Sequence, residues 1–272
     1  MNLYQKAKEI ARVNGIRLKK RMGQHFMIDG HVLEYLVSHA AIKESDTVLE
    51  IGAGFGFLTR LLAQKTRRVV AVEIDSRIMK ALQCELSDLS NVDFIEADFF
   101  NVRLPRFNKV VSNPPFQASS PLIFRLLEED FDLAVLTLQE DFARRLNAVV
   151  GSKDYGRLTV STYYSYRVEL LDSVSREAFY PQPRVDALIV RLKPRDKPPL
   201  SITNDQIFKE VVRILFSQRN RKVRKALRPF LRRYGSKQEK MLKESDALPF
   251  CEKRVRELTP EDFGVLANAL SK

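Results

Sequence analysis

The sequence predicts an α/β fold in which helices cover a largely parallel sheet, followed by a small helical domain. Short apolar runs alternate with amphipathic stretches from Thr47 onward, which is typical of strands buried between helices. A glycine-rich loop follows the first of these runs directly. Beyond the last run, the stiff, proline-rich segment 193–199 leads into a basic part of the chain with helical periodicity.

Five apolar runs predict the parallel strands, and three amphipathic stretches predict helices between them. The strands are Thr47–Ile51, Arg68–Glu73, Val92–Glu96, Lys109–Ser112 and Leu133–Gln139. The helices are Gly56–Gln64, Ser76–Leu86 and Ser120–Leu127. Two later strands, Arg167–Ser173 and Asp186–Leu192, flank the turn Tyr180-Pro-Gln-Pro183, so we expect them to pair antiparallel at the end of the sheet.

The proline-rich segment 193–199 is the expected domain boundary, which divides the chain into domains over 1–194 and 195–272. In the second domain, Asn204–Phe216 and Arg221–Tyr234 have helical periodicity. A third helix is expected over Thr259–Leu270, because it opens with Thr-Pro-Glu.

Basic residues outnumber acidic ones, with a formal net charge of +12 and a pI near 9.7. This balance favours nucleic acid as the partner, although charge also serves solubility alone. No apolar run approaches the roughly 20 residues of a membrane span, and the N-terminus lacks the apolar centre of a secretory signal. We therefore expect a cytoplasmic protein, and a monomer because the sequence has no obvious apolar seam.

The glycine loop Glu50-Ile-Gly-Ala-Gly-Phe-Gly56 joins the first strand to the first helix, where glycines let the backbone approach a ligand closely. Alone, such a loop would also suit NAD, FAD or a plain turn. Its spacing is G-x-G-x-G after an acid, whereas dinucleotide enzymes usually have G-x-G-x-x-G for a pyrophosphate. S-adenosylmethionine has no phosphate and carries cationic groups, so it fits better, with Gly52 and Gly54 as contacts.

Two acids at the next strand ends support a nucleoside cofactor. Glu73 lies about 20 residues after the glycines, where such an acid accepts hydrogen bonds from ribose hydroxyls, whereas Asp75 is better suited to cap the next helix. Asp98 is expected to accept a hydrogen bond from the adenine amine of the cofactor, with Ile74 or Phe99 beside the ring. Each acid alone could be an ordinary loop residue, but three loops at successive strand ends indicate S-adenosylmethionine.

The tetrapeptide Asn113-Pro-Pro-Phe116 follows the fourth strand and predicts methylation of an exocyclic amine. An amine such as adenine N6 is a poor nucleophile because its lone pair is delocalised into the ring. The Asn113 side-chain oxygen and the Pro114 carbonyl would accept its two hydrogens, and Phe116 would stack on the base. Positioning and electrostatics then suffice without a strong base. Asn113, Pro114 and Phe116 are the expected catalytic residues.

The sequence lacks the residue patterns that bind metal ions. His25, His31 and His39 have no partners at metal-ligand spacing, and Cys84 and Cys251 lie far apart without a zinc or disulfide pattern. The motifs of serine hydrolases and P-loop enzymes are also absent. We expect no metal.

The segment 218–233 contains eight basic residues and no acid. On the expected helix, the basic side chains lie on one face and Val223, Leu227 and Phe230 on the other. A face that served only solubility would normally include acids, so contact with phosphates is favoured. The expected RNA-binding residues are Arg221, Lys222, Arg224, Lys225 and Arg228. The basic run Arg17–Arg21 is expected on the other side of the same cleft.

Three further motifs carry a family resemblance that extends over nearly all of the chain. They are Gly23-Gln-His-Phe-Met-Ile-Asp29, the segment from Tyr180 to Arg191, and Phe216-Ser-Gln-Arg-Asn-Arg-Lys222. Together with the glycine loop and Asn113–Phe116, they resemble the KsgA/Dim family of small-subunit ribosomal RNA adenine dimethyltransferases. The resemblance implies a Rossmann-like, class I methyltransferase sheet that binds S-adenosylmethionine, and a C-terminal domain that binds RNA. It also implies transfer of four methyl groups to two adjacent adenosines near the 3′ end of small-subunit rRNA, with a role in ribosome biogenesis.

The resemblance further implies site residues. It assigns cofactor contacts to His25, Met27, Gly52, Glu73 and Asp98, and it places Asn113 where the cofactor meets the target base. His25 and Met27 stand where many members have Asn and Leu. Pro114 and Phe116 stand where bacterial members usually have an aliphatic residue and Tyr, and the continuation 117–121 looks archaeal or eukaryotic.

Two alternatives stay open. A related enzyme could methylate large-subunit rRNA or DNA, but the motifs at 180–191 and 216–222 argue against it. A non-catalytic RNA-binding assembly or transcription factor could keep the same fold. Because Glu73, Asp98 and Asn113 are intact, this non-catalytic alternative is the second choice.

Overall fold

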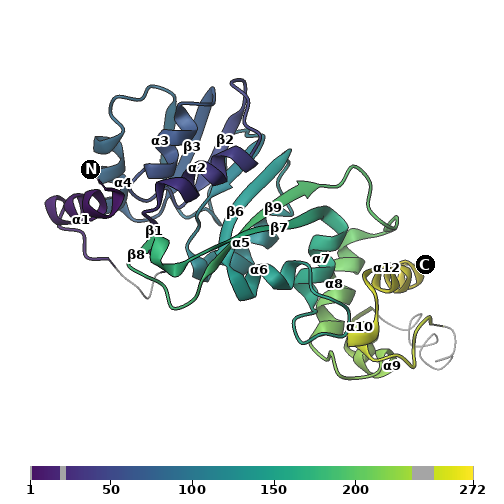
Figure 1. The fold of residues 1–272 in the computed structure, drawn as a ribbon. Helices are drawn as coiled ribbons and strands as arrows, with labels where there is room; N and C mark the ends of the chain where they lie inside the picture. The colour runs from purple at the N-terminus through teal and green to yellow at the C-terminus, as the bar shows by residue number, and fades with distance from the viewer. Residues whose placement is uncertain (1, 19–22, 235–247, 272) are drawn as a thin grey trace. The chain divides into compact units, whose positions relative to one another are not determined.

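The computed structural model describes residues 2–18, 23–234 and 248–271, without the side chains of residues 233 and 234. The chain forms two compact units (Figure 1). Unit 1 comprises Met1–Ala143 and Val168–Pro194, and unit 2 comprises Arg144–Arg167 and Arg195–Lys272. The division after Pro194 coincides with the expected boundary. The segment Arg144–Arg167, which the sequence placed in the first domain, belongs to unit 2, because its side chains Tyr155, Val160 and Tyr164 lie in the apolar core of that unit.

Unit 1 is built on a seven-stranded sheet with the order β4-β3-β2-β5-β6-β9-β7. Its strands are β2 (Thr47–Ile51), β3 (Arg68–Glu73), β4 (Val92–Glu96), β5 (Lys109–Ser112), β6 (Leu133–Gln139), β7 (Tyr166–Val174) and β9 (Ala187–Pro194). The strands β2 to β6 pair in parallel and have the predicted bounds. The two later strands form the end of the sheet, where β9 pairs antiparallel with β6 and β7 lies beside β9.

The register of the parallel strands brings their functional loops to one edge. Ile51 pairs with Val72, and Glu73 pairs with Glu96 on the next strand. The carboxyl ends of parallel strands share an edge, and ligands of open α/β sheets bind there. The glycine loop, Glu73, Asp98 and Asn113 therefore emerge side by side.

The three helices predicted in unit 1 begin within one residue of their expected starts, and the unit contains further helices that the sequence analysis did not assign. Together, these helices are α2 (Gly30–His39), α3 (Phe57–Ala63), α4 (Ser76–Glu85), α5 (Ser119–Leu126) and, at the end of the unit, α6 (Glu140–Leu146), with the 3-10 turns η2 (Phe116–Ala118) and η3 (Arg176–Ala178). Asp75 caps α4 by accepting a hydrogen bond from the Arg77 amide at 3.1 Å, which confirms its predicted role.

An N-terminal arm, residues 3–28, completes unit 1, although the sequence analysis assigned no element there. It contains α1 (Leu3–Val13) and β1 (Phe26–Met27), and β1 pairs antiparallel with β8 (Phe179–Tyr180). The arm packs its apolar side chains against Phe55 of the glycine loop and against α4. This small core consists of Ala7, Ile10, Ile16, Phe26, Phe55, Ile78 and Ala81.

Unit 2 is helical. Its elements are α7 (Arg157–Ser165), α8 (Asp205–Phe216), α9 (Val223–Ala226), α10 (Arg228–Tyr234), the 3-10 turn η4 (Val255–Glu257) and α12 (Pro260–Leu270). Helix α8 packs against α7, α10 and α12. Asn204 caps α8 and Thr259 caps α12, so the helices predicted over 204–216 and 259–270 are confirmed.

The single helix predicted over Arg221–Tyr234 is wrong, because the segment forms the two short helices α9 and α10. Pro229 explains the break: it has no N–H to donate, and its ring would clash with the carbonyl four residues earlier in a continuous helix. The predicted division of faces nevertheless holds. Val223, Leu227 and Phe230 are buried, whereas Arg221, Arg224, Lys225 and Arg228 are exposed. Within the described ranges, the longest and most apolar helices still fall short of what a membrane crossing requires.

Candidate active site

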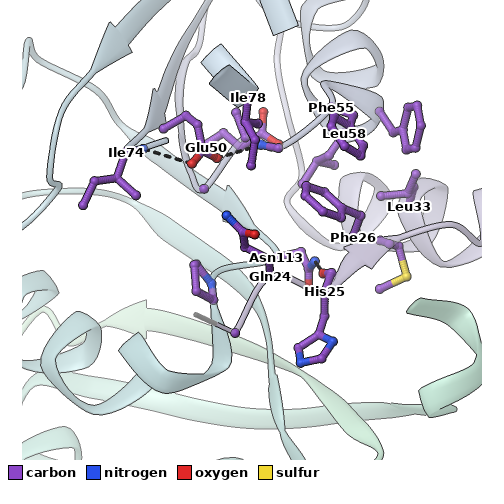
Figure 2. A pocket seen from close by; sticks show the side chains of 18 residues that line it. Gln24, His25, Phe26, Leu33, Glu50, Phe55, Leu58, Ile74, Ile78 and Asn113 are labelled. Carbon is purple, nitrogen blue, oxygen red and sulfur yellow. Dashed lines mark hydrogen bonds between the residues drawn. The ribbon is translucent and has the colours of Figure 1, made fainter. Parts of the chain in front are cut away.

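A pocket at the carboxyl edge of the sheet gathers most of the predicted cofactor contacts (Figure 2). One wall is the segment Gly23–Met27 of the N-terminal arm, which we call the strap, and the other walls come from the glycine loop and the end of β3. Apolar side chains such as Leu33, Phe55 and Leu58 line one side. The predicted residues that line it are His25, Met27, Gly52, Gly54, Glu73 and Asn113, together with Glu50.

A second pocket adjoins the first, because Gly52, Glu73, Ile74 and Pro115 line both. Asp98 lies in it, as does Pro114. Its apolar lining includes Phe99, Phe100, Ala118 and Leu122. The structure therefore brings the three predicted cofactor loops and the Asn-Pro-Pro segment around one recess of unit 1, with an acidic half and a more apolar half.

Glu73 is buried between the two pockets, and backbone amides hold both of its carboxylate oxygens. One oxygen accepts from the Gly54 amide at 3.1 Å, and the other accepts from the amides of Ile74 and Asp75, each at 3.0 Å. Burial raises the pKa of Glu73, and the three amide hydrogen bonds oppose that shift. The carboxylate is thus fixed in place at the junction of the pockets.

Glu50 is the second buried acid of this recess, with only 2% of its surface exposed. Its Oε2 atom has no hydrogen-bond partner within the described part of the chain. Burial raises the pKa of Glu50 to about 8, the Thr59 hydroxyl opposes the shift, and the charge of Glu73 adds to it. An acid in this state is suited to bind a cation that enters the pocket.

Asp98 is held by its own loop. One carboxylate oxygen accepts from the Phe100 amide at 3.0 Å, and the other accepts from the side-chain amide of Asn101 at 2.7 Å. Ile74 is 57% exposed and Phe99 is buried, and both line the pocket that contains Asp98. This arrangement suits a flat ring whose amine donates to Asp98.

In the side-chain amide of Asn113, the NH₂ group makes a hydrogen bond and the oxygen does not. Its Nδ2 atom donates to the backbone carbonyl of His25 at 3.0 Å. Its Oδ1 atom is buried and has no partner among the described residues. A buried acceptor without a partner is costly, so a ligand donor at this point would stabilise the site.

Phe116 lies outside both pockets in this structure. Its side chain is 6% exposed and belongs to the apolar core of unit 1, where its ring contacts Phe179 edge-on with centroids 5.6 Å apart. The His25 ring lies on another side, at 5.6 Å. Stacking of Phe116 on a target base therefore stays a prediction.

The glycines of the loop are needed for protein contacts as well as for a ligand. Gly52 and Gly54 have φ values of 75° and 58°, which side chains rarely adopt. A Cβ on Gly52 would lie 3.0 Å from the Pro115 ring, and one on Gly54 would lie 2.8 Å from the Phe26 ring. The loop is therefore closed in by the Asn-Pro-Pro segment and by the strap. The part of the chain with described coordinates contains no cluster of three or more His, Cys, Asp or Glu that could hold a metal.

Comparison with known protein families identifies the family of the chain. The family described as ribosomal RNA adenine dimethylase matches residues 15–266, which include every residue that lines the recess. The chain belongs to the ribosomal RNA adenine dimethylase family. The match spans both units and is not confined to the sheet.

Curated relatives of this dimethylase are similar to it in sequence over nearly its full length. A protein of Methanopyrus kandleri called probable ribosomal RNA small subunit methyltransferase A is 42% identical over 259 residues, covering 94% of this chain and 93% of its own. A protein of the same name from Methanothermobacter thermautotrophicus is 40% identical, covering 96% of this chain and 94% of its own. These relatives are archaeal, as the residues at 117–121 indicated.

Solved structures similar to the dimethylase share its fold. A dimethyladenosine transferase from Plasmodium falciparum is 30% identical with a TM-score of 0.79, covering 89% of this chain and 96% of its own. The 23S rRNA methyltransferase ErmE is 29% identical with a TM-score of 0.66, covering 91% of this chain and all of its own. The predicted Rossmann-like, class I methyltransferase fold is confirmed.

Membership of this family makes the chain an adenine methyltransferase that uses S-adenosylmethionine. The recess fits that cofactor: the unpartnered carboxyl oxygen of Glu50 suits its cationic amino-acid end, and the fixed carboxylate of Glu73 suits a ribose. Asp98, in the apolar half, suits an adenine amine.

The sequence analysis did not name several residues that line the recess or hold its side chains in place. Gln24 and Phe26 of the strap line the pocket, as do Leu33 and Ile78, and Asn101 holds Asp98. The family resemblance marked the strap and named His25 and Met27 in it, but it did not name these neighbouring residues. Asn101, three residues after Asp98, could have been found from the tendency of short amides to bond within their own loop.

The basic surface of the dimethylase, Arg221–Arg228, meets an acid that the local sequence does not contain. Glu252 accepts from Lys222 at 2.6 Å and pairs with Arg224 at 3.1 Å. The hydrogen bond from Lys222 lowers the pKa of Glu252. The other three predicted RNA-binding residues form no ion pair with a described residue; they are Arg221, Lys225 and Arg228. The expected contribution of Lys19, Lys20 and Arg21 lies outside the described residues.

Proposed function

We propose that this chain methylates N6 of two adjacent adenosines near the 3′ end of small-subunit ribosomal RNA to N6,N6-dimethyladenosine, as a step of ribosome biogenesis. The observation that carries the proposal is the unpartnered, buried oxygen of Asn113 beside the cofactor recess. The full-length similarity to archaeal small-subunit methyltransferases supports the choice of RNA.

S-adenosylmethionine supplies an electrophilic methyl group, and the residues of the recess would hold it in one orientation. Glu50 would pair with the ammonium group, and Glu73 would accept hydrogen bonds from the ribose. Asp98 would accept from the adenine amine, with Ile74 beside the ring. The backbone of Gly52, Gly54 and the strap residues His25 and Met27, together with Asn113, would complete the contacts.

Asn113 and Pro114 would bind the target amine. The Asn113 oxygen and the Pro114 carbonyl are acceptors, so each would take one N6 hydrogen and direct the nitrogen lone pair toward the methyl group. Pro114 and Pro115 have fixed φ, which limits the freedom of both acceptors. Most of the rate enhancement would then come from position and from stabilisation of the developing positive charge on nitrogen.

The proton that leaves N6 needs no strong base in this account. Once the nitrogen is alkylated it becomes acidic, and the Asn113 oxygen already accepts a hydrogen bond from it. Because the second methyl transfer starts from an amine with a single hydrogen, one acceptor is enough to orient it. The same pair of residues can therefore serve both steps.

The RNA would be held by the basic surface of unit 2. Arg221, Lys225 and Arg228 are exposed, and Lys222 and Arg224 could exchange Glu252 for a phosphate. Contacts of this type depend on the backbone and the shape of the RNA. The target adenine must leave its stack to reach Asn113, as with other enzymes that act on a base.

The test is a methylation assay. The protein is incubated with undermethylated small subunits or with naked small-subunit rRNA, in the presence of cofactor labelled on its methyl group, and the RNA is digested to nucleosides. We expect label in N6,N6-dimethyladenosine from at least one of the two substrates. A digest without labelled dimethyladenosine from either substrate would reject the proposal.

A further inference from the structure

The strap links Asn113 to the turn at 180–183 through hydrogen bonds on both of its sides. On one side, the His25 carbonyl accepts from Asn113 Nδ2 at 3.0 Å. On the other, the His25 ring atom Nδ1 lies 2.5 Å from the Pro181 carbonyl oxygen. Figure 2 shows the His25 ring directed away from Glu50, on the opposite side from the acidic part of the pocket.

The orientation of the Asn113 amide decides whether it can bind the target amine. A side-chain amide presents either its oxygen or its NH₂ group in a given direction. If the NH₂ group faced the adenine N6 hydrogens, two donors would oppose each other. The His25 carbonyl selects the other orientation, because it can only accept, and this leaves Oδ1 as the free acceptor.

The His25 carbonyl is held in turn by contacts with the segment Ala178–Pro181. Phe26 and Met27 pair with Tyr180 and Phe179, and the Ile28 amide donates to the Ala178 carbonyl at 2.8 Å. The His25 ring adds the last contact, next to the carbonyl in question. Because the Pro181 carbonyl is an acceptor, Nδ1 must carry the proton of this hydrogen bond.

We propose that His25 is a positioning residue: its Nδ1–H, by donating to the Pro181 carbonyl, holds the strap so that the His25 carbonyl keeps the Asn113 oxygen available for the target amine. The inference rests on the proposed role of Asn113 as acceptor. It gives the turn Tyr180–Pro183 a task in methyl transfer, through a chain of two hydrogen bonds and without contact with the substrate.

The test compares three substitutions of His25 in the full-length protein. His25→Ala removes the donor. His25→Asn restores a donor at the same place, because Asn Nδ2 is one bond from Cγ, as is His Nδ1. His25→Gln places its amide one atom further out. We expect His25→Ala to lower kcat for dimethylation by about tenfold to hundredfold, the range expected for a misplaced acceptor. His25→Asn should recover most of that loss, and His25→Gln should recover little.

Two further measurements separate positioning from loss of fold or of cofactor binding. The cofactor dissociation constant, measured by calorimetry, should change far less than kcat. In a double-mutant cycle, His25→Ala should cost nothing further in an Asn113→Ala background, because the group it positions is already gone.

The outcomes distinguish this inference from the proposed function. A wild-type kcat for His25→Ala, or equal losses for His25→Asn and His25→Ala in folded proteins, overturns the positioning role while Asn113→Ala still has a strongly reduced kcat. Additive effects in the double-mutant cycle also overturn it. Full methyl transfer by Asn113→Ala overturns both this inference and the acceptor role of Asn113.

Discussion

Glu50 and Glu73 are two buried carboxyl groups that face the same pocket in different states. Backbone amides of Gly54, Ile74 and Asp75 hold the Glu73 carboxylate, whereas one oxygen of Glu50 has no partner among the described residues. Burial, together with the Glu73 charge, raises the pKa of Glu50 to about 8. The site for a cationic ligand therefore contains one fixed charge, Glu73, and one acid, Glu50, that can ionise when the ligand binds.

Cofactor affinity should depend on pH through Glu50. Below about pH 8, the neutral acid must release its proton to pair with the cofactor ammonium. The dissociation constant of the cofactor should therefore fall as pH rises, by at most about tenfold per pH unit. Above about pH 8 it should level off. Glu50→Gln cannot ionise and should lack this part of the dependence. Calorimetric titrations of both proteins over the same pH series provide the check, and parallel curves would contradict it.

The stability of the free protein should change with pH in the opposite direction. Because the pKa of Glu50 is raised in the folded state, its contribution is fully present below the ordinary value of 4.5 and is lost as pH rises through about 8. One proton gives a slope of at most about 1.4 kcal/mol per pH unit. Urea unfolding without cofactor should show this slope in the wild type and a flatter one in Glu50→Gln. A steeper decline in the variant would refute the assignment.

Asn101 should support recognition of the cofactor adenine. Its amide holds Asp98 Oδ2 at 2.7 Å, so Asn101→Ala leaves that carboxylate held by the Phe100 amide alone. We expect the KM for the cofactor to rise about fivefold, the effect of one hydrogen bond, with little change in kcat. Arg103→Ala, in the same loop region and exposed, is the control and should behave as wild type. An unchanged KM for Asn101→Ala would assign Asn101 to loop structure alone.

RNA affinity should respond in opposite ways to two changes in the basic surface. The double substitution Arg221→Ala and Arg228→Ala should reduce the slope of log K against log salt by about 0.7 to 0.9 for each lost phosphate contact. Glu252→Gln should steepen it and tighten binding roughly twofold to fivefold, because Lys222 and Arg224 are released. Lys209→Ala on α8 controls for the loss of one positive charge. If the control and the double variant lose the same slope per charge removed, the RNA binds elsewhere.

The sheet could be predicted from the sequence because its signals are local. Each parallel strand is a short apolar run between turn residues, and all five were found with the correct bounds. The loops after these runs carry the site residues, and the rules of parallel sheets place those loops at one edge. Glu73, Asp98 and Asn113 could therefore be brought together without a structure.

What the sequence did not reveal depends on contacts between distant segments. The strap reaches Asn113 across 88 residues, and the family resemblance, not a local pattern, indicated that it belongs to the site. Glu252 reaches Lys222 across 30 residues, and the local sequence around Lys222 does not indicate that contact. The basic run seemed free of acids only because Glu252 is far away in the chain. The helix predicted over 221–234 failed for a local reason, since amphipathic periodicity outweighed the effect of Pro229.

The position and number of methyl groups on small-subunit rRNA test the central claim most directly. Undermethylated small subunits are treated with wild-type protein or with Asn113→Ala, and the nuclease fragments of their rRNA are weighed by mass spectrometry. The account predicts that one fragment near the 3′ end gains four methyl groups, as two adjacent dimethyladenosines, with the wild type alone. Methylation at another site, methylation of large-subunit rRNA instead, or equal methylation by Asn113→Ala would contradict it.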